Sequence, residues 1–105
     1  MLGNLLHGKA FTFGSGKTWA EVATITTAVQ TVAAPGVRVG DLVLVLKPTH
    51  QAGLSVESLA RVAANDVLTV KFNNPTASGV TPTASETYTG LVFRPEDSLS
   101  NYAGG

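Results

Sequence analysis

The 105-residue sequence contains no cysteine and little charge. Without cysteine, disulfide bonds, thiolate metal sites and thiol nucleophiles are all excluded. Seven basic and seven acidic residues give a net charge of zero, and only 13% of residues are charged, about half the usual fraction. Phosphate backbones are bound by concentrated basic patches, yet no two Lys or Arg residues are adjacent here. We therefore expect no nucleic-acid partner.

Long apolar stretches are also missing. The longest apolar run, residues 42–46, is far below the ~20 residues that a membrane-spanning helix needs. Residues 1–9 lack the basic segment and long apolar stretch that are typical of a secretory signal. The absence of cysteine suits synthesis in a reducing cytoplasm. We expect no membrane partner and production in the cytoplasm.

Strand-forming and turn-forming residues dominate instead. Threonine and valine, with 13 residues each, favour strands, and the 11 glycines favour turns. The sequence predicts an all-β fold, a single antiparallel β-sandwich or barrel of five to six strands. We divide the chain into an extended N-terminal arm (residues 1–20), a β-domain (residues 21–95) and a short C-terminal tail (residues 96–105).

Two segments give the clearest strand patterns. In residues 42–46 both alternating sets of side chains are apolar, which predicts a central strand covered on both faces. Asn65 and Asp66 separate two strand-like runs, residues 56–64 and 67–73. Two residues that tolerate a left-handed backbone at such a position predict a tight hairpin.

The residues that could carry chemistry form no complete site. Gly14–Thr18 matches the second half of a phosphate-binding P-loop, but Phe11 stands where the pattern needs a glycine. We interpret the segment as a flexible turn with a solvated lysine. His7 and His50 have no carboxylate or second histidine at ligand spacing. The sequence predicts no catalytic residue, no metal site and no cofactor, so we expect no enzyme.

A small domain of this kind is often strengthened by oligomerisation. With both ends of the chain assigned to an arm and a tail, part of the apolar content must be buried against another molecule. For Trp19, which follows the glycine-rich turn, burial inside the domain is at least as good an interpretation as a contact with a partner. The residues that we predict at a subunit interface are Leu5, Leu6, Phe11, Phe13, Trp19 and Tyr102.

The second half of the chain contains a characteristic succession of strand and turn residues, at positions 36–45, 52–54, 61–76 and 92–95 together with Tyr88. In this succession it resembles small virion proteins of tailed bacteriophages, of the head-decoration (cement) and head-fibre type. The resemblance implies a β-sandwich that forms homotrimers on the capsid exterior, with the major capsid protein as partner. Two alternatives remain open, a phage tail or baseplate adaptor and a carbohydrate-binding or adhesin module, which would expose clustered aromatic side chains.

Overall fold

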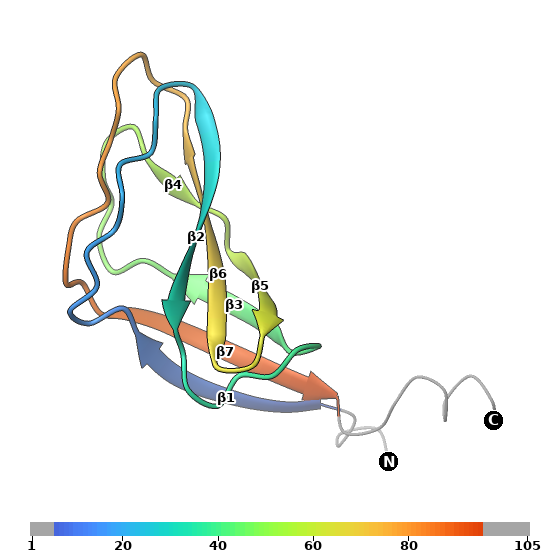
Figure 1. Cartoon of the computed structure of the whole chain (residues 1–105). Coiled ribbons are helices and arrows are strands. Elements are labelled where there is room, and N and C mark those ends of the chain that lie inside the picture. The colour runs from blue at the N-terminus through green and yellow to red at the C-terminus, as the bar shows by residue number, and fades with distance from the viewer. Residues whose placement is uncertain (1–5, 96–105) are drawn as a thin grey trace, which may run out of the picture.

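The structure, a computed structural model, describes residues 6–95 (Figure 1). Within this part of the chain it is all-β and has no helix, so the predicted fold class is confirmed. Residues 6–95 form seven strands in one antiparallel sheet, rather than the five to six that we predicted. The strands are β1 (Leu6–Phe13), β2 (Thr26–Ala33), β3 (Leu42–Leu46), β4 (Ser55–Val56), β5 (Leu59–Ala64), β6 (Val67–Asn74) and β7 (Tyr88–Pro95).

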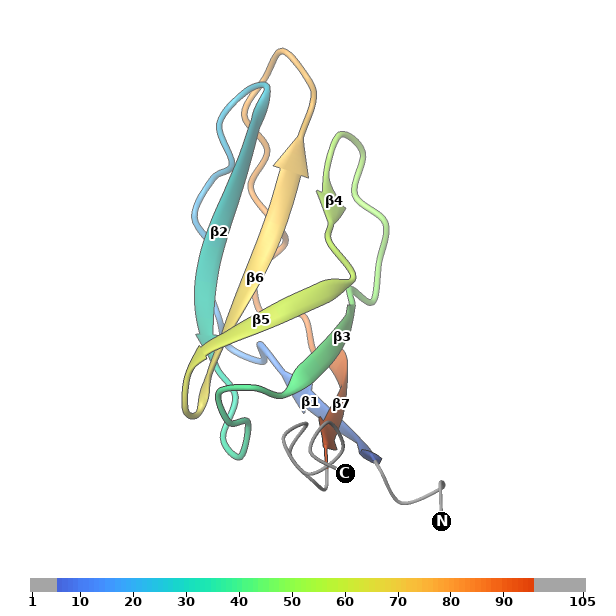
Figure 2. The same cartoon turned by 90° about the vertical axis from the view of Figure 1, so that its right-hand side faces the viewer.

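The sheet is open, and its strands follow the order β1-β7-β3-β5-β6-β2, with β4 paired to β6. Strands β1 and β2 are therefore its two edges. The β2–β6 pair runs at a steep angle to the β1–β7 pair, and β3 and β5 lie between them (Figures 1 and 2). Because the sheet turns so strongly, its two ends enclose a core on one face, which we call the inner face.

Strand β1 occupies part of the segment that we assigned to an arm. It pairs with β7 along its whole length, from Leu6 opposite Pro95 to Phe13 opposite Tyr88. The arm prediction is therefore wrong for residues 6–13. The physical reason lies in the alternation of Phe11 and Phe13, whose side chains both reach the inner face. The ring of Phe11 lies over Gly90, where a side chain would collide with it.

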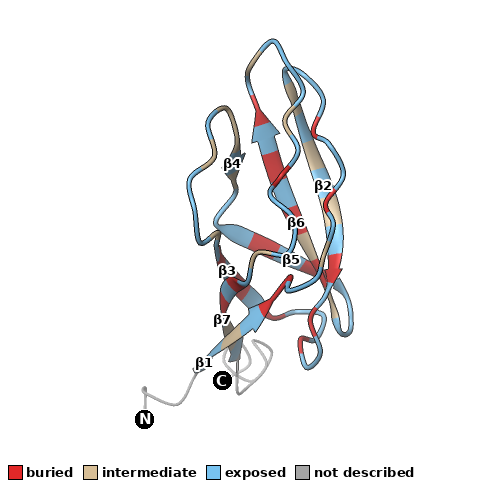
Figure 3. Cartoon of the chain, turned by 90° about the vertical axis from the view of Figure 1, so that its left-hand side faces the viewer, coloured by how far each residue is buried: buried red, intermediate tan, exposed pale blue. Residues whose placement is uncertain are grey.

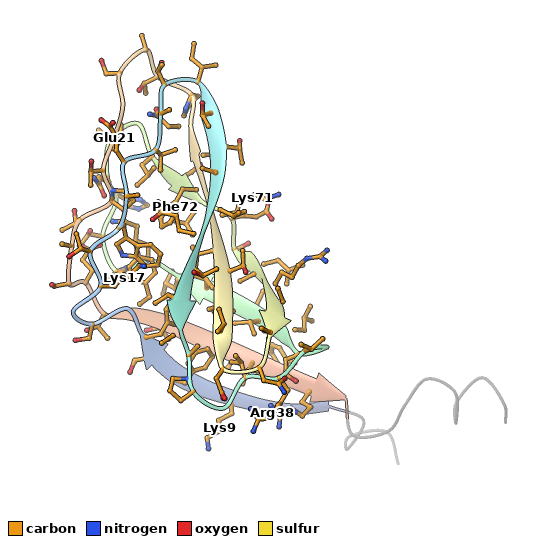
Figure 4. The ribbon with its side chains drawn as sticks, viewed as in Figure 1. Lys9, Lys17, Glu21, Arg38, Lys71 and Phe72 are labelled. Carbon is orange, nitrogen blue, oxygen red and sulfur yellow. The ribbon has the colours of Figure 1, made fainter. Side chains whose placement is uncertain are left out.

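An aromatic cluster fills the core. The ring of Trp19 packs edge-on against Phe72 of β6, with 5.1 Å between ring centroids. It also packs against Tyr88 of β7 at 5.4 Å, and Tyr88 in turn packs against Phe13 of β1 at 5.4 Å. Figure 4 shows Phe72 pointing inward from β6 toward the segment that carries Lys17. The cluster therefore joins strands that are not neighbours in the sheet.

The predicted hairpin at Asn65 and Asp66 is confirmed. The pairing of β5 with β6 closes at Ala64 and Val67, and Asp66 has a left-handed φ of 68°, which aspartate tolerates. The turn also holds the loop that precedes β3. The Asp66 carboxylate accepts the backbone N–H of Gly36 at 2.8 Å, and Asn65 Oδ1 accepts that of Val39 at 3.1 Å.

Asn74, at the end of β6, is fully buried but has all its polar atoms bonded. Its Nδ2 donates to the carbonyl oxygens of Val22 (3.0 Å) and Ser78 (2.8 Å). Its Oδ1 accepts from the backbone N–H (2.9 Å) and the hydroxyl (2.6 Å) of Thr76. One side chain thus ties the loop before β2 to the loop after β6.

We predict that Asn74→Asp lowers the free energy of unfolding by at least about 2 kcal/mol. The carboxylate has no donor for the Val22 and Ser78 carbonyls, so buried polar atoms lose their partners. Urea unfolding at neutral pH measures the change. The matched control is Asn73→Asp one position away. Asn73 is exposed, and its Oδ1 only accepts a hydrogen bond from the Thr27 hydroxyl, which a carboxylate does equally well. Equal losses in both variants would contradict the role given to Asn74.

Candidate protein-interaction surface

One face of β3 is left uncovered by the chain. Val43 and Val45 are buried in the core, whereas Leu42, Leu44 and Leu46 keep 46%, 40% and 66% of their surface exposed. Strand β3 pairs with β5 and β7, so its predicted central place in the sheet is confirmed. The prediction that both of its faces are covered is wrong for the single chain. A single sheet has one inner face, and between residues 6 and 95 no helix or second sheet covers the other.

The exposed leucines continue across neighbouring strands in register. Leu44 lies opposite Leu59 on β5 and opposite Leu91 on β7, which makes a row of three leucines. Leu59 is 48% and Leu91 36% exposed. We call this surface the leucine face; Figure 2 views the side of the molecule that carries β3 and β5. It is formed by Leu42, Leu44, Leu46, Leu59, Leu91 and the half-buried Phe93.

The leucine face carries no charge where β1, β7 and β3 lie side by side. The remaining outward-facing residues there are Gly8, Ala10, Thr12 and Thr89. The five leucines together expose the equivalent of more than two complete leucine side chains. Burial contributes about 1.5–3 kcal/mol for each complete leucine, so covering this face would stabilise a complex by several kcal/mol.

Charged residues lie at one side of the leucine face. A groove of about 500 Å³ there is lined partly by Leu42, Leu59, Arg61 and Lys71. The Lys71 ammonium lies 3.8 Å from the Glu57 carboxylate, and both side chains are about half exposed. An apolar centre with a polar rim is the usual anatomy of a protein–protein interface. The burial pattern in Figure 3 shows the contrast between the two faces, with buried and exposed positions alternating along the strands.

An ion pair fixes the end of the leucine face. Arg94 of β7 donates from Nε to Asp41 Oδ1 (2.8 Å) and from its terminal nitrogen to Asp41 Oδ2 (2.7 Å). Asp41 directly precedes β3, and its side chain is 2% exposed. The hydrogen bonds from Arg94 are the largest reason that the pKa of Asp41 is lowered, and the Arg38 backbone N–H adds to it. The pair holds the start of β3 against the end of β7.

Of the residues that we predicted at an interface, the structure describes the side chains of Phe11, Phe13 and Trp19, and all three lie on the inner side of the fold. Phe13 and Trp19, at 5% and 2% exposed, belong to the core of the chain itself rather than to an exposed interface, and for Trp19 burial is the alternative that the sequence left open. Phe11 is half-buried over Gly90 on the inner face. Leu6 is in β1, but its side chain is not described, and Leu5 and Tyr102 lie outside the described residues.

The P-loop-like segment is a turn, as we predicted. The Lys17 backbone N–H donates to the Gly14 carbonyl at 2.9 Å, and Gly14 and Gly16 have φ values of 87° and 81°. The chain continues from there in an extended form, and the Lys17 ammonium lies 5.3 Å from the Trp19 ring centroid, a cation–π contact. The segment therefore lacks the helix N-terminus on which a P-loop binds phosphate.

Other potential sites are weak in the part of the chain that the structure describes. His50 is exposed in a loop, and no cluster of three metal-ligating side chains occurs among residues 6–95. Burial, with a contribution from the Glu86 charge, raises the pKa of Tyr88 to about 12. That phenol therefore stays protonated at neutral pH and is a poor base. Between residues 6 and 95 no helix is long and apolar enough to span a membrane.

We predict that Arg94→Gln destabilises the protein at neutral pH and flattens its acid unfolding profile. The lowered pKa of Asp41 gives stability that is present above its ordinary value of 3.8 and is lost as the pH falls through the lowered value. Without Arg94 the largest cause of that shift is gone, so the two proteins should converge in stability in acid. Urea unfolding across this pH range measures the effect.

The matched control for that experiment is Arg38→Gln. Arg38 pairs with Asp66 at 3.0 Å, but both side chains are about half exposed. The pKa of Asp66 is lowered chiefly by the Gly36 backbone N–H, which this variant keeps. Its pH profile should therefore stay close to that of the parent protein. If Arg94→Gln left the slope unchanged, the ion pair with Asp41 would not stabilise the fold.

Comparison with known proteins adds no relative to this picture. No protein-family model matches the chain, and neither curated proteins nor solved structures give a match. Assignment of a function therefore depends on the surface of the molecule and on the resemblance noted in the sequence. Of these two, the leucine face is the feature with measurable geometry.

Proposed function

We propose that this protein is a non-catalytic structural module that works by packing its leucine face against another protein subunit. The observation that carries the proposal is the row of Leu59, Leu44 and Leu91, which lies exposed and in register across three strands. Large exposed apolar patches on soluble proteins mark interaction sites or aggregation liabilities. A low net charge also favours association over dispersion.

In finer terms, we propose that the chain decorates and stabilises the capsid of a tailed bacteriophage from the outside. The resemblance of residues 36–95 to head-decoration proteins supports this, and it implies the major capsid protein and further copies of the chain, as a homotrimer, as partners. A neutral β-module whose binding surface is a sheet face suits a role that consists of packing on a protein lattice.

A tail or baseplate adaptor would use the same kind of surface, and the position of the protein in the particle separates it from the capsid role. The carbohydrate-binding alternative has less support. Sugar sites use exposed aromatic platforms, but Trp19, Phe72 and Tyr88 are fully buried. Phe11 and Phe93 are half-buried on opposite faces of the sheet. Within the described residues no fully exposed aromatic side chain is present.

We predict that the purified chain binds shells stripped of accessory proteins, prepared from the phage whose genome carries the coding sequence. Co-sedimentation should show binding that saturates at a fixed ratio to the major capsid protein, and the shells should resist heat better when the chain is bound. Leu46→Lys should weaken binding at least tenfold, because it places a charge where an apolar contact is expected.

The control is Ala77→Lys, which adds the same charge at an exposed position in the loop that follows β6. That loop lies at the end of the molecule far from β1 and β7 (Figure 1). It should bind as the parent chain does. Binding to isolated tails alone would favour the adaptor, and binding to glycans without shells would favour the carbohydrate module. Retention on immobilised ATP would contradict the non-catalytic assignment.

A further inference from the structure

The leucine face is stepped rather than flat. On β3 the large side chains of Leu42, Leu44 and Leu46 form a ridge. Two strands away, β1 presents a strip of small residues, Gly8, Ala10 and Thr12, on the same face. Strand β7 lies midway between the ridge and the strip.

The ridge and the strip are matched row by row through β7. Leu44 and Ala10 both pair with Leu91, whereas Leu46 and Thr12 both pair with Thr89. In the third row the Phe93 ring leans over Gly8, where an added methyl group would come within 3.1 Å of it. The part of the strip that no neighbouring ring covers, and that can therefore receive a side chain, consists of Ala10 and Thr12.

We propose that the leucine face is an isologous interface that pairs two copies of this chain. A two-fold axis that runs along the outer side of β7 exchanges the ridge of each copy with the strip of the other. Leu44 then lies over Ala10 of the second copy, and Leu46 lies over Thr12 of the second copy. Large residues opposite small ones are what interdigitating sheet packing requires. This inference rests on the proposed packing role of the leucine face, and it replaces the homotrimer that the resemblance implies with a two-fold pair.

Charge favours a second copy as the occupant. A two-fold pairing places identical surfaces against each other, so any net charge on the face would repel itself. The outward residues of β1, β7 and β3 between Gly8 and Thr12, Thr89 and Phe93, and Leu42 and Leu46 are all uncharged. The first charged neighbours, Arg61 and Lys71, lie beyond β3 on the far side from the axis. Self-pairing therefore meets no electrostatic barrier.

The size of the face sets the strength of the pair. The three strands β1, β7 and β3, at about 4.8 Å spacing and with five residues at about 3.4 Å each, give about 250 Å² of flat sheet. A standard stable interface buries about 800 Å² on each partner. Side-chain relief raises the buried area above the flat value, but the pair remains at the weak end. We therefore expect a dimer that dissociates on dilution.

Light scattering coupled to size-exclusion chromatography, from low-micromolar to submillimolar protein, tests the pairing. The parent chain should pass from 10.8 kDa to twice that mass as its concentration rises. Leu46→Lys should weaken dimerisation at least tenfold, because it charges the ridge. Ala77→Lys, the control variant, should dimerise like the parent. Both positions are exposed in the single chain, so we expect both variants to fold. Urea unfolding checks that they do.

The Ala10→Leu variant distinguishes complementary packing of the ridge against the strip from nonspecific hydrophobic association. Ala10 is exposed on β1, so the larger side chain leaves the core untouched. In the proposed pair it fills the strip and collides with Leu44 of the second copy, so dimerisation should weaken. General hydrophobic association would strengthen instead, since the variant adds apolar surface, and that result would overturn the proposal.

Two other results would overturn the pairing without touching the proposed function. A monomer at every concentration, combined with loss of shell binding in Leu46→Lys, would assign the leucine face to the capsid protein. A mass of three times 10.8 kDa would exclude the two-fold arrangement and support the trimer that the resemblance implies. Failure of the proposed function itself would appear separately, as absence of shell binding by a chain that still forms dimers.

Discussion

The packing of Trp19 between Phe72 and Tyr88 is the contact on which the rest of the fold depends. These two partners belong to β6 and β7, which two other strands separate in the sheet. An indole that touches both can exist only if the sheet bends until its ends approach each other. The bend commits the inner face of nearly every strand to one core. The opposite face is then left with whatever residues alternation places there, and on β3 these are leucines.

Polar groups in the structure serve mainly to hold loops at the ends of strands. Asn74 bonds to two loops at one end of the molecule, and the pair of Asp41 and Arg94 joins two strand ends near the other. Lys47 and Glu86, whose side chains are 8% and 12% exposed, do the same between β3 and the segment before β7. The sequence has few charged side chains, and a large share of them form these ion pairs. The outer face of β1, β7 and β3 carries none of the remaining charges.

The sequence was sufficient to predict what local patterns control. The Asn65–Asp66 hairpin and the central place of β3 both follow from a few adjacent residues, and both are confirmed. Strand β1 was assigned to the arm because its pairing depends on β7, and Phe11 needs the gap at Gly90 to reach the inner face. The leucine face was missed because the sequence of an all-apolar strand is the same whether its outer face is buried by the same chain or by a partner protein. A count of the helices or further strands that could bury this outer face would have distinguished the two cases.

The pairing of the first described strand with the last has a consequence for synthesis. The closest pair between β1 and β7, Phe13 and Tyr88, is 75 residues apart in the chain. Strand β3 also pairs with β7, so one of its edges stays unpaired until β7 has been synthesised, although its other neighbour, β5, follows soon after it. Long-range pairings of this kind are reached slowly in folding. A nascent chain therefore carries its most apolar segment unpaired along one edge until the last strand has left the ribosome, and aggregation competes with folding during that interval.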